Sequence, residues 1–210
     1  MDAIAGLLRT NRGRVRFMGH DVTHLPPAQR TRMGIAYVPQ DRQEDGLVLD
    51  FSLVENTILR DFRHQPFSRL GFLRDGVAEQ HTVKLLESFD VRPRDPQRKA
   101  RDLSGGNQQK VILAREVSRN PNLMIAAQPT RGLDVGAIEG IHKQLVRLRD
   151  EGHAVLLVSL ELDEILALSD RIAVIHGGNI VDIVDGETAT REQIGLLMTG
   201  TREATGGTKS

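Results

Sequence analysis

Short apolar runs along the chain predict β-strands. They span Arg14–Phe17, Ile35–Val38, Leu123–Ala126 and the run AVLLVS at 154–159. The last run is apolar almost throughout, which is typical of a strand buried on both faces of a parallel sheet. The segment RIAVIHGGNIVDIV, at 171–184, predicts a β-hairpin, because Gly177-Gly178-Asn179 can take the positive φ of a tight turn.

Helical spacing of apolar residues fills much of the chain between these strands. One stripe consists of Val77, Val83, Leu85, Leu86 and Phe89, and it predicts a mostly helical insertion near 51–100. Further helices are predicted from 105 to a stop at Pro121, from about Gly136 to Arg149, and over DEILALSD at 163–170. The alternation of strand and helix predicts an α/β core.

Composition narrows the classes of partner. Lys+Arg and Asp+Glu are both 28, and aromatic residues make up 3%, so neither net charge nor base stacking favours a nucleic-acid partner. There are no cysteines, no apolar run of membrane-spanning length, and no signal peptide in MDAIAGLLRTNRGR. We therefore expect a cytosolic domain. The segment from 199 to 210 is predicted to be a disordered tail.

The segment LSGGNQQK, at 103–110, contains the most informative motif. Two glycines after Ser104, directly before a helix, leave backbone N–H groups open to a terminal phosphate at the positive helix end. An ordinary helix start with Ser104 as N-cap fits the same residues equally well.

The motifs together resemble the ATPases of ABC transporters. LSGGNQQK resembles the family's signature, in the form found in sugar and nucleoside importers, and AYVPQDR resembles its Q-loop with Gln40 as the glutamine. IAAQPTRGLDVGAIE, at 125–139, resembles the Walker B end and D-loop of the C-terminal ATPase half of importers served by basic-membrane-protein-type nucleoside-binding lipoproteins. The similarity extends from about Ala5 to about Val184. It implies a P-loop NTPase-type α/β core with a helical signature subdomain over about 51–120, and a partial nucleotide-binding domain over 1–198.

The chain departs from the active family pattern at the end of the predicted strand Leu123–Ala126. The Walker B aspartate of the family falls on Ala127, and the catalytic glutamate falls on Gln128. A methyl group cannot hold the shell of a magnesium ion, and a neutral amide cannot accept a proton from water. We therefore expect no intact catalytic residue and no metal ligand here.

Two further parts of the family pattern are missing. Leu160 stands at the position of the switch histidine, and leucine cannot form a hydrogen bond to a phosphate. No segment has the P-loop form G-x-x-x-x-G-K-[ST], and the final GGTKS does not supply one. The resemblance begins at AIAGLL, which is similar to the helix after the P-loop, so the chain is expected to be truncated and to lack the P-loop and the strands before it.

The resemblance implies a division of labour. In this family two ATPase halves face each other head to tail, and each ATP lies between the P-loop of one half and the signature of the other. Besides Gln40, the residues implied to serve nucleotide are Ser104, Gly105, Gly106, Gln108 and Asp134. ATP and Mg²⁺ would be held mainly by the partner half. The implied partners are that half, transmembrane permease subunits and, indirectly, a substrate-binding lipoprotein, with the chain peripheral on the inner face of the cell membrane.

Alternatives to this interpretation were a competent ATPase with unrecognised catalytic residues, a soluble ABC protein of the DNA-repair or chromosome type, and a vestigial fragment without a stable fold. The second would need long heptad arms, which the sequence lacks. Asp41, Arg42, Glu44 and Asp45 are expected in a solvated loop, Phe51, Leu53 and Val54 in the core, and all seven histidines at the surface.

Overall fold

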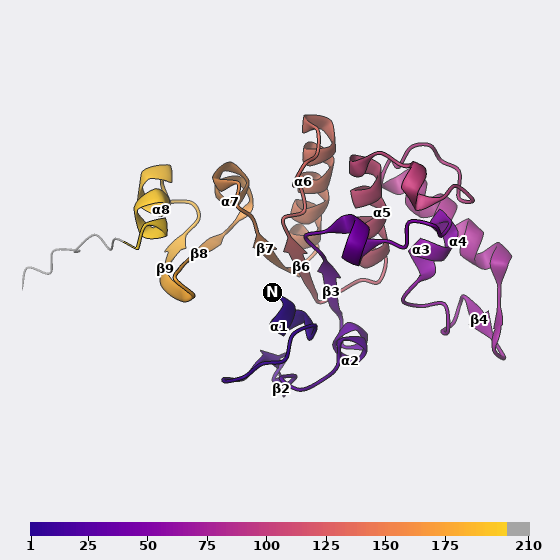
Figure 1. Cartoon of the computed structure of the whole chain (residues 1–210), viewed down its shortest axis with the longest axis horizontal. Helices are drawn as coiled ribbons and strands as arrows, with labels where there is room; N and C mark the ends of the chain where they lie inside the picture. Colours follow the sequence, from indigo (N-terminus) through magenta and orange to yellow (C-terminus); the bar gives the residue numbers. More distant parts are fainter. Residues whose placement is uncertain (201–210) are drawn as a thin grey trace, which may run out of the picture. The chain divides into compact units, whose positions relative to one another are not determined.

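The computed structural model describes residues 1–200 and contains two compact units, Met1–Val158 and the segment from Ser159 onward (Figure 1). The predicted single domain over 1–198 remains a prediction. The final helix α8 (Arg191–Met198) is capped by Thr199, whose N–H donates to the carbonyl of Leu196. Most of the predicted tail, 201–210, lies outside the described residues.

A parallel sheet forms the centre of the first unit. Its strands are β3 (Ile35–Val38), β6 (Leu123–Ala127) and β7 (Ala154–Val158), in the order β3-β6-β7 (Figure 1). Ile35 pairs with Leu123, and Leu123 pairs with Ala154 on its other side. The predictions of these three strands are confirmed, and the middle strand is the most buried, because it has a neighbour on each edge.

The predicted burial of β7 on both faces is wrong. Val155, Leu156 and Leu157 are only half-buried, and Val158 is 38% exposed. Within residues 1–200, β7 pairs with β6 on one edge and with no strand on the other. An apolar run shows that a strand prefers a buried place in a sheet, but the burial itself depends on neighbours that lie far away in the sequence.

The N-terminal part of the first unit is held together by Arg30. This part comprises α1 (Asp2–Ala5), β1 (Arg16–Phe17), β2 (His20–Asp21) and α2 (Pro27–Arg32), so β1 is shorter than predicted. The side chain of Arg30 is 2% exposed and donates to the carbonyls of Ala3, Ile4, Thr23 and Leu25. Burial lowers the pKa of Arg30, and these acceptors offset the cost of burying its charge.

The region near 51–100, predicted to be mostly helical, contains two α-helices separated by a short hairpin, and a further helix follows before β6. The chain from 51 to β6 contains α3 (Leu53–Ile58), β4 (Ser68–Arg69), β5 (Phe72–Leu73), α4 (Asp75–Ser88), the 3₁₀ turn η2 (Ala100–Asp102) and α5 (Gly105–Val117). The hairpin formed by β4 and β5 was not predicted. Leu53 is fully buried, which confirms its place in the core, whereas Phe51 is 39% exposed.

His81 on α4 is a second correction, because it is half-buried and not a surface residue. Its ring lies edge-on against Phe67, with 5.0 Å between the ring centroids. Burial lowers the pKa of His81. Folding therefore favours the neutral imidazole, and this contribution to stability is present above the unfolded pKa of about 6.5 and is lost as the pH falls through the folded pKa.

We expect the His81→Gln variant to show a weaker pH dependence of stability than the wild type below about pH 6.5. Glutamine does not titrate, so the loss that comes from protonating His81 disappears. Urea midpoints of both proteins measured from pH 7 to pH 5 check this. Parallel curves for the two proteins would contradict it.

The first unit also contains α6 (Val135–Asp150), and the second unit contains α7 (Leu162–Leu168), β8 (Arg171–His176), β9 (Asn179–Asp185) and α8. Of these remaining elements, α6, α7 and the hairpin of β8 and β9 follow the predicted pattern, whereas α8 was not predicted. The hairpin of β8 and β9 turns at Gly177 and Gly178, with φ of 54° and 79°, as predicted. A cluster of Ile172, Val174, Ile194 and Leu197 forms the core of the second unit. None of the described helices is both long and apolar enough to span a membrane.

Candidate functional site: the start of α5 and the loop before α6

The start of α5 is a capped helix end with an exposed serine. Ser104 is the N-cap, and its Oγ accepts from the backbone N of Asn107 at 3.5 Å and from the Asn107 side chain at 2.9 Å. The predicted capping role is confirmed. It does not exclude phosphate binding, because a helix start has four N–H groups without a helical acceptor, and one cap satisfies only part of them.

Gly106 is needed for packing inside the chain, and the space beside Gly105 is filled by a side chain. A Cβ on Gly106 would lie 2.8 Å from the Cβ of Ala137, and a Cβ on Gly105 would lie 2.7 Å from Nη2 of Arg42. Cβ contacts this short are not tolerated unless the neighbour moves. The absence of a side chain at Gly106 therefore lets α5 approach the start of α6.

Asp134 lies beside this approach. It is the N-cap of α6, and its Oδ1 accepts from the backbone N of Ala137 at 2.9 Å. Its other oxygen, Oδ2, lies 3.8 Å from the position that a Cβ on Gly106 would occupy. The structure thus brings Asp134 together with Gly106 and its neighbours Ser104 and Gly105, although about thirty residues separate the two loops in the sequence.

Gln108 faces inward from α5. Its side chain is 2% exposed, donates to the carbonyl of Ala100 at 3.0 Å, and accepts from Nε2 of Gln43 at 3.1 Å. Both ends of the amide are therefore used within the chain. This geometry favours a supporting role for Gln108 over the predicted direct contact with nucleotide.

Gln40 is exposed and follows the end of β3. The next residue, Asp41, accepts from the backbone N of Gln43 and Glu44, and the bond from Glu44 is the main cause that lowers the pKa of Asp41. These bonds begin the π-helical turn η1 (Arg42–Gly46). The interpretation of this segment as a solvated loop is wrong for Arg42, which is half-buried against the start of α5. No local pattern in the sequence indicates this contact.

The end of β6 holds the two departures from the family pattern. Ala127 is 6% exposed and offers only a methyl group. Gln128 has a φ of 46°, in the left-handed region that is costly for a residue with a side chain, and its backbone N donates to the carbonyl of Val158 at 2.7 Å. Within residues 1–200, no group of three or more His, Cys, Asp or Glu residues is placed to hold a metal ion.

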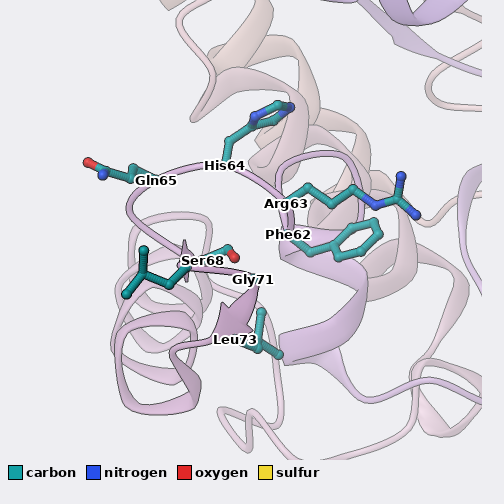
Figure 2. Close-up of a pocket in the computed structure, with 8 residues that line it drawn as sticks. Phe62, Arg63, His64, Gln65, Ser68, Gly71 and Leu73 are labelled. Carbon is teal, nitrogen blue, oxygen red and sulfur yellow. The ribbon is translucent and has the colours of Figure 1, made fainter.

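Leu160, at the position of the switch histidine, belongs to the second unit and is 75% exposed. A hollow of about 620 Å³ lies around the hairpin of β4 and β5 (Figure 2), and it is lined by Phe62, Arg63, His64, Gln65, Ser68, Leu70, Gly71 and Leu73. None of the predicted site residues lines this hollow.

A parallel sheet with a glycine-led helix and an aspartate-capped helix beside it is the arrangement found in an ATP-binding cassette. The chain belongs to the ABC transporter family, whose profile matches residues 1–131. Its fold matches the crystal structure of a nucleotide-free ATP-binding cassette from an ABC transporter, with a TM-score of 0.72 and 25% identity over 88% of this chain and 74% of that one. The dimeric cassette MJ0796 bound to ADP and Pi has the same fold, with a TM-score of 0.73, 23% identity, and 88% and 78% of the two chains covered.

Several relatives are much closer in sequence. The nucleoside import ATP-binding protein NupA of Lactococcus lactis subsp. cremoris is 50% identical over 94% of this chain and 39% of its own length. The guanosine import ATP-binding protein NupO of Bacillus subtilis is 48% identical over 99% of this chain and 41% of its own length. The glucose import ATP-binding protein TsgD13 of Haloferax volcanii is 45% identical over 97% of this chain and 38% of its own length. The chain therefore spans about two fifths of the length of these relatives.

Proposed function

We propose that the chain is part of the ATP-binding subunit of an ABC importer for nucleosides or simple sugars. In this role it presents Ser104–Gly106 and Asp134 to an ATP molecule whose phosphates are held by a second ATPase half. The observation that supports this most directly is the joint placement of these residues, because α5 approaches α6 so closely at Gly106 that a Cβ there would lie 2.8 Å from the Cβ of Ala137. The import functions printed for the relatives support the transport class.

The residues present fit one side of a bound ATP. The open helix start at Ser104 and the positive end of the 13-residue helix α5 suit the terminal phosphate. ATP supplies the bond that is hydrolysed. Ser104 would donate a hydrogen bond from its hydroxyl to a phosphate oxygen, and the N–H groups of Gly105 and Gly106 would stabilise negative charge there and help to exclude water from that side.

The residues at the end of β6 do not fit a magnesium ion. Ala127 supplies no oxygen ligand, and the amide of Gln128 supplies at most one neutral oxygen. Gln128 can orient a water molecule through a hydrogen bond, but it cannot take its proton at neutral pH. We therefore assign proton transfer and metal binding to the partner half.

The chain would act within a larger transporter complex. The partners are a second ABC ATPase half, transmembrane permease subunits and, indirectly, a substrate-binding lipoprotein. The complex would place this chain in the cytoplasm, peripheral on the inner face of the membrane. The relatives support the importer class of this arrangement, because each is an import ATP-binding protein that contains a region similar to this chain.

We expect the purified chain alone to release phosphate from ATP no faster than a buffer control. Ala127 and Gln128 leave this chain without a metal ligand and a proton acceptor at the strand end, and catalytic groups that act together fail together. Phosphate release with Mg²⁺ and ATP measures this. Turnover of about 1 per second or faster, within the usual range of enzymes, would show that this chain has catalytic residues of its own.

A further inference from the structure

Arg42 contacts both loops of the proposed half-site. Its Nη1 donates to the carbonyl of Arg131 at 3.1 Å, in the loop that leads to Asp134. Its guanidinium also fills the place of a side chain on Gly105, because a Cβ there would lie 2.7 Å from Nη2, 3.1 Å from Cζ and 3.3 Å from Nε. The Nε atom is shielded from solvent and has no hydrogen-bond partner among the described residues.

The turn that contains Arg42 is fixed to α5 at two more points. Gln43 donates to Gln108, and a Cβ on Gly46 would lie 2.5 Å from Cδ1 of Ile112. Gln108 and Ile112 are four residues apart, so they lie on one face of α5 in successive turns. The turn η1 is therefore packed against the first turns of α5, and Arg42 extends this connection to the carbonyl of Arg131.

The charge of Arg42 is not explained by stability alone. The guanidinium of Arg42 faces the positive end of α5, where a cation is unfavourable, and the carboxylate of the neighbouring Asp41 attracts it from the preceding position in the chain. No acidic side chain forms an ion pair with Arg42 within residues 1–200. A planar group with several donors suits this place, because it can lie flat on a glycine while it reaches a carbonyl.

We propose that Arg42 is a positioning residue that holds the start of α5 and the loop before α6 in one geometry, so that the phosphate of a facing ATP meets both together. The inference rests on the proposed function of this half-site. It also assigns a reason to Gly105: this position lacks a side chain because the guanidinium of Arg42 occupies that space.

A double-mutant cycle in the assembled two-half ATPase tests the proposal. We expect Arg42→Ala and Gly105→Ala each to lower kcat by roughly 10-fold with KM for ATP unchanged, because the partner half holds the nucleotide. The double variant should be no slower than Arg42→Ala, since Gly105→Ala acts by displacing a side chain that is already gone. Arg42→Lys should recover part of kcat, because it retains one donor for the carbonyl of Arg131.

Controls separate this proposal from the proposed function. Arg32→Ala, at an exposed arginine of α2, should turn over ATP like the wild type. Additive losses of roughly 100-fold in the double variant would overturn the proposal. The proposal would also be overturned if Arg42→Ala lowered the thermal midpoint enough to explain its lost activity and if Arg42→Lys recovered none of that activity. If Gly105→Asp abolishes turnover while Arg42→Ala has no effect, the result supports the proposed half-site and contradicts the positioning role of Arg42. If Gly105→Asp is also without effect, the proposed function itself fails.

Discussion

Gly105→Asp is expected to abolish ATP turnover in the assembled two-half ATPase. The new Cβ would lie 2.7 Å from Nη2 of Arg42, so the guanidinium must move. The new carboxylate would lie beside that guanidinium and compete with the terminal phosphate for the positive end of α5, and two negative charges there repel most strongly where water is excluded. Loss of one aligned donor to a developing charge costs about 100- to 1000-fold in kcat, and this change disturbs several at once. Steady-state phosphate release measures the effect.

Gln128→Ala is the matched comparison, because it changes the proposed inactive side of the same chain. We expect turnover within about 2-fold of the wild type. A neutral amide cannot accept a proton from water, so replacing it removes no proton-transfer step. Both variants should be measured in the same assembled ATPase. If Gln128→Ala reduced turnover as much as Gly105→Asp does, the division between a serving half-site and an inactive strand end would be wrong.

Glu116→Gln is expected to lower the free energy of unfolding by about 3 kcal/mol. The side chains of Glu116 and Arg115 are 0% and 2% exposed, and Oε1 of Glu116 accepts from Arg115 at 2.9 Å and from Arg60 at 3.1 Å. Arg115 also donates to the carbonyl of Asn56 on α3. Burial lowers the pKa of Arg115, and the charge of Glu116 opposes that shift. Loss of the carboxylate leaves a buried cation without its counter-ion, which weakens the attachment of α5 to α3.

The same substitution at an exposed ion pair provides the control. Glu151 pairs with Arg147 at 2.8 Å, and their side chains are 47% and 68% exposed. Solvent screens such a pair, so Glu151→Gln should change stability by less than about 0.5 kcal/mol. Urea unfolding of the three proteins compares them directly. Equal midpoints for the two variants would show that the buried pair contributes no more than a surface pair.

The sequence predicted the positions of the strands in the parallel sheet better than the elements that neighbour them. Continuous apolar runs indicated β3, β6 and β7, because a strand in a buried sheet needs apolar side chains along its length. They could not indicate which edge of β7 has a neighbour. The hairpin of β4 and β5 was missed because each strand has only two residues and because its turn uses Leu70 with a φ of 53°, where glycine or asparagine is usual.

The site could be predicted as a set of motifs but not as a geometry. The LSGG motif indicated Ser104–Gly106 as candidate site residues, and the motif in the loop before α6 indicated Asp134. Their proximity depends on Gly106 meeting Ala137, which is a contact between two helices and has no local signature. Arg42 was assigned to solvent because charged neighbours surround it in the sequence. Its packing against Gly105 follows from the path of the backbone after β3, and only the structure shows that path.

The pairing of β3 with β6 has a consequence for how the chain is made. Ile35 pairs with Leu123, so the whole helical segment lies between the two partners. A ribosome adds about 5–20 residues per second, and β3 therefore waits for roughly 5–20 s before β6 has been synthesised. During that time Ile35, Ala36 and Val38, which are buried in the finished sheet, have no partner strand. Slower translation across α3, α4 and α5 would lengthen this exposure, and a chaperone that binds nascent apolar strands would act on β3 first.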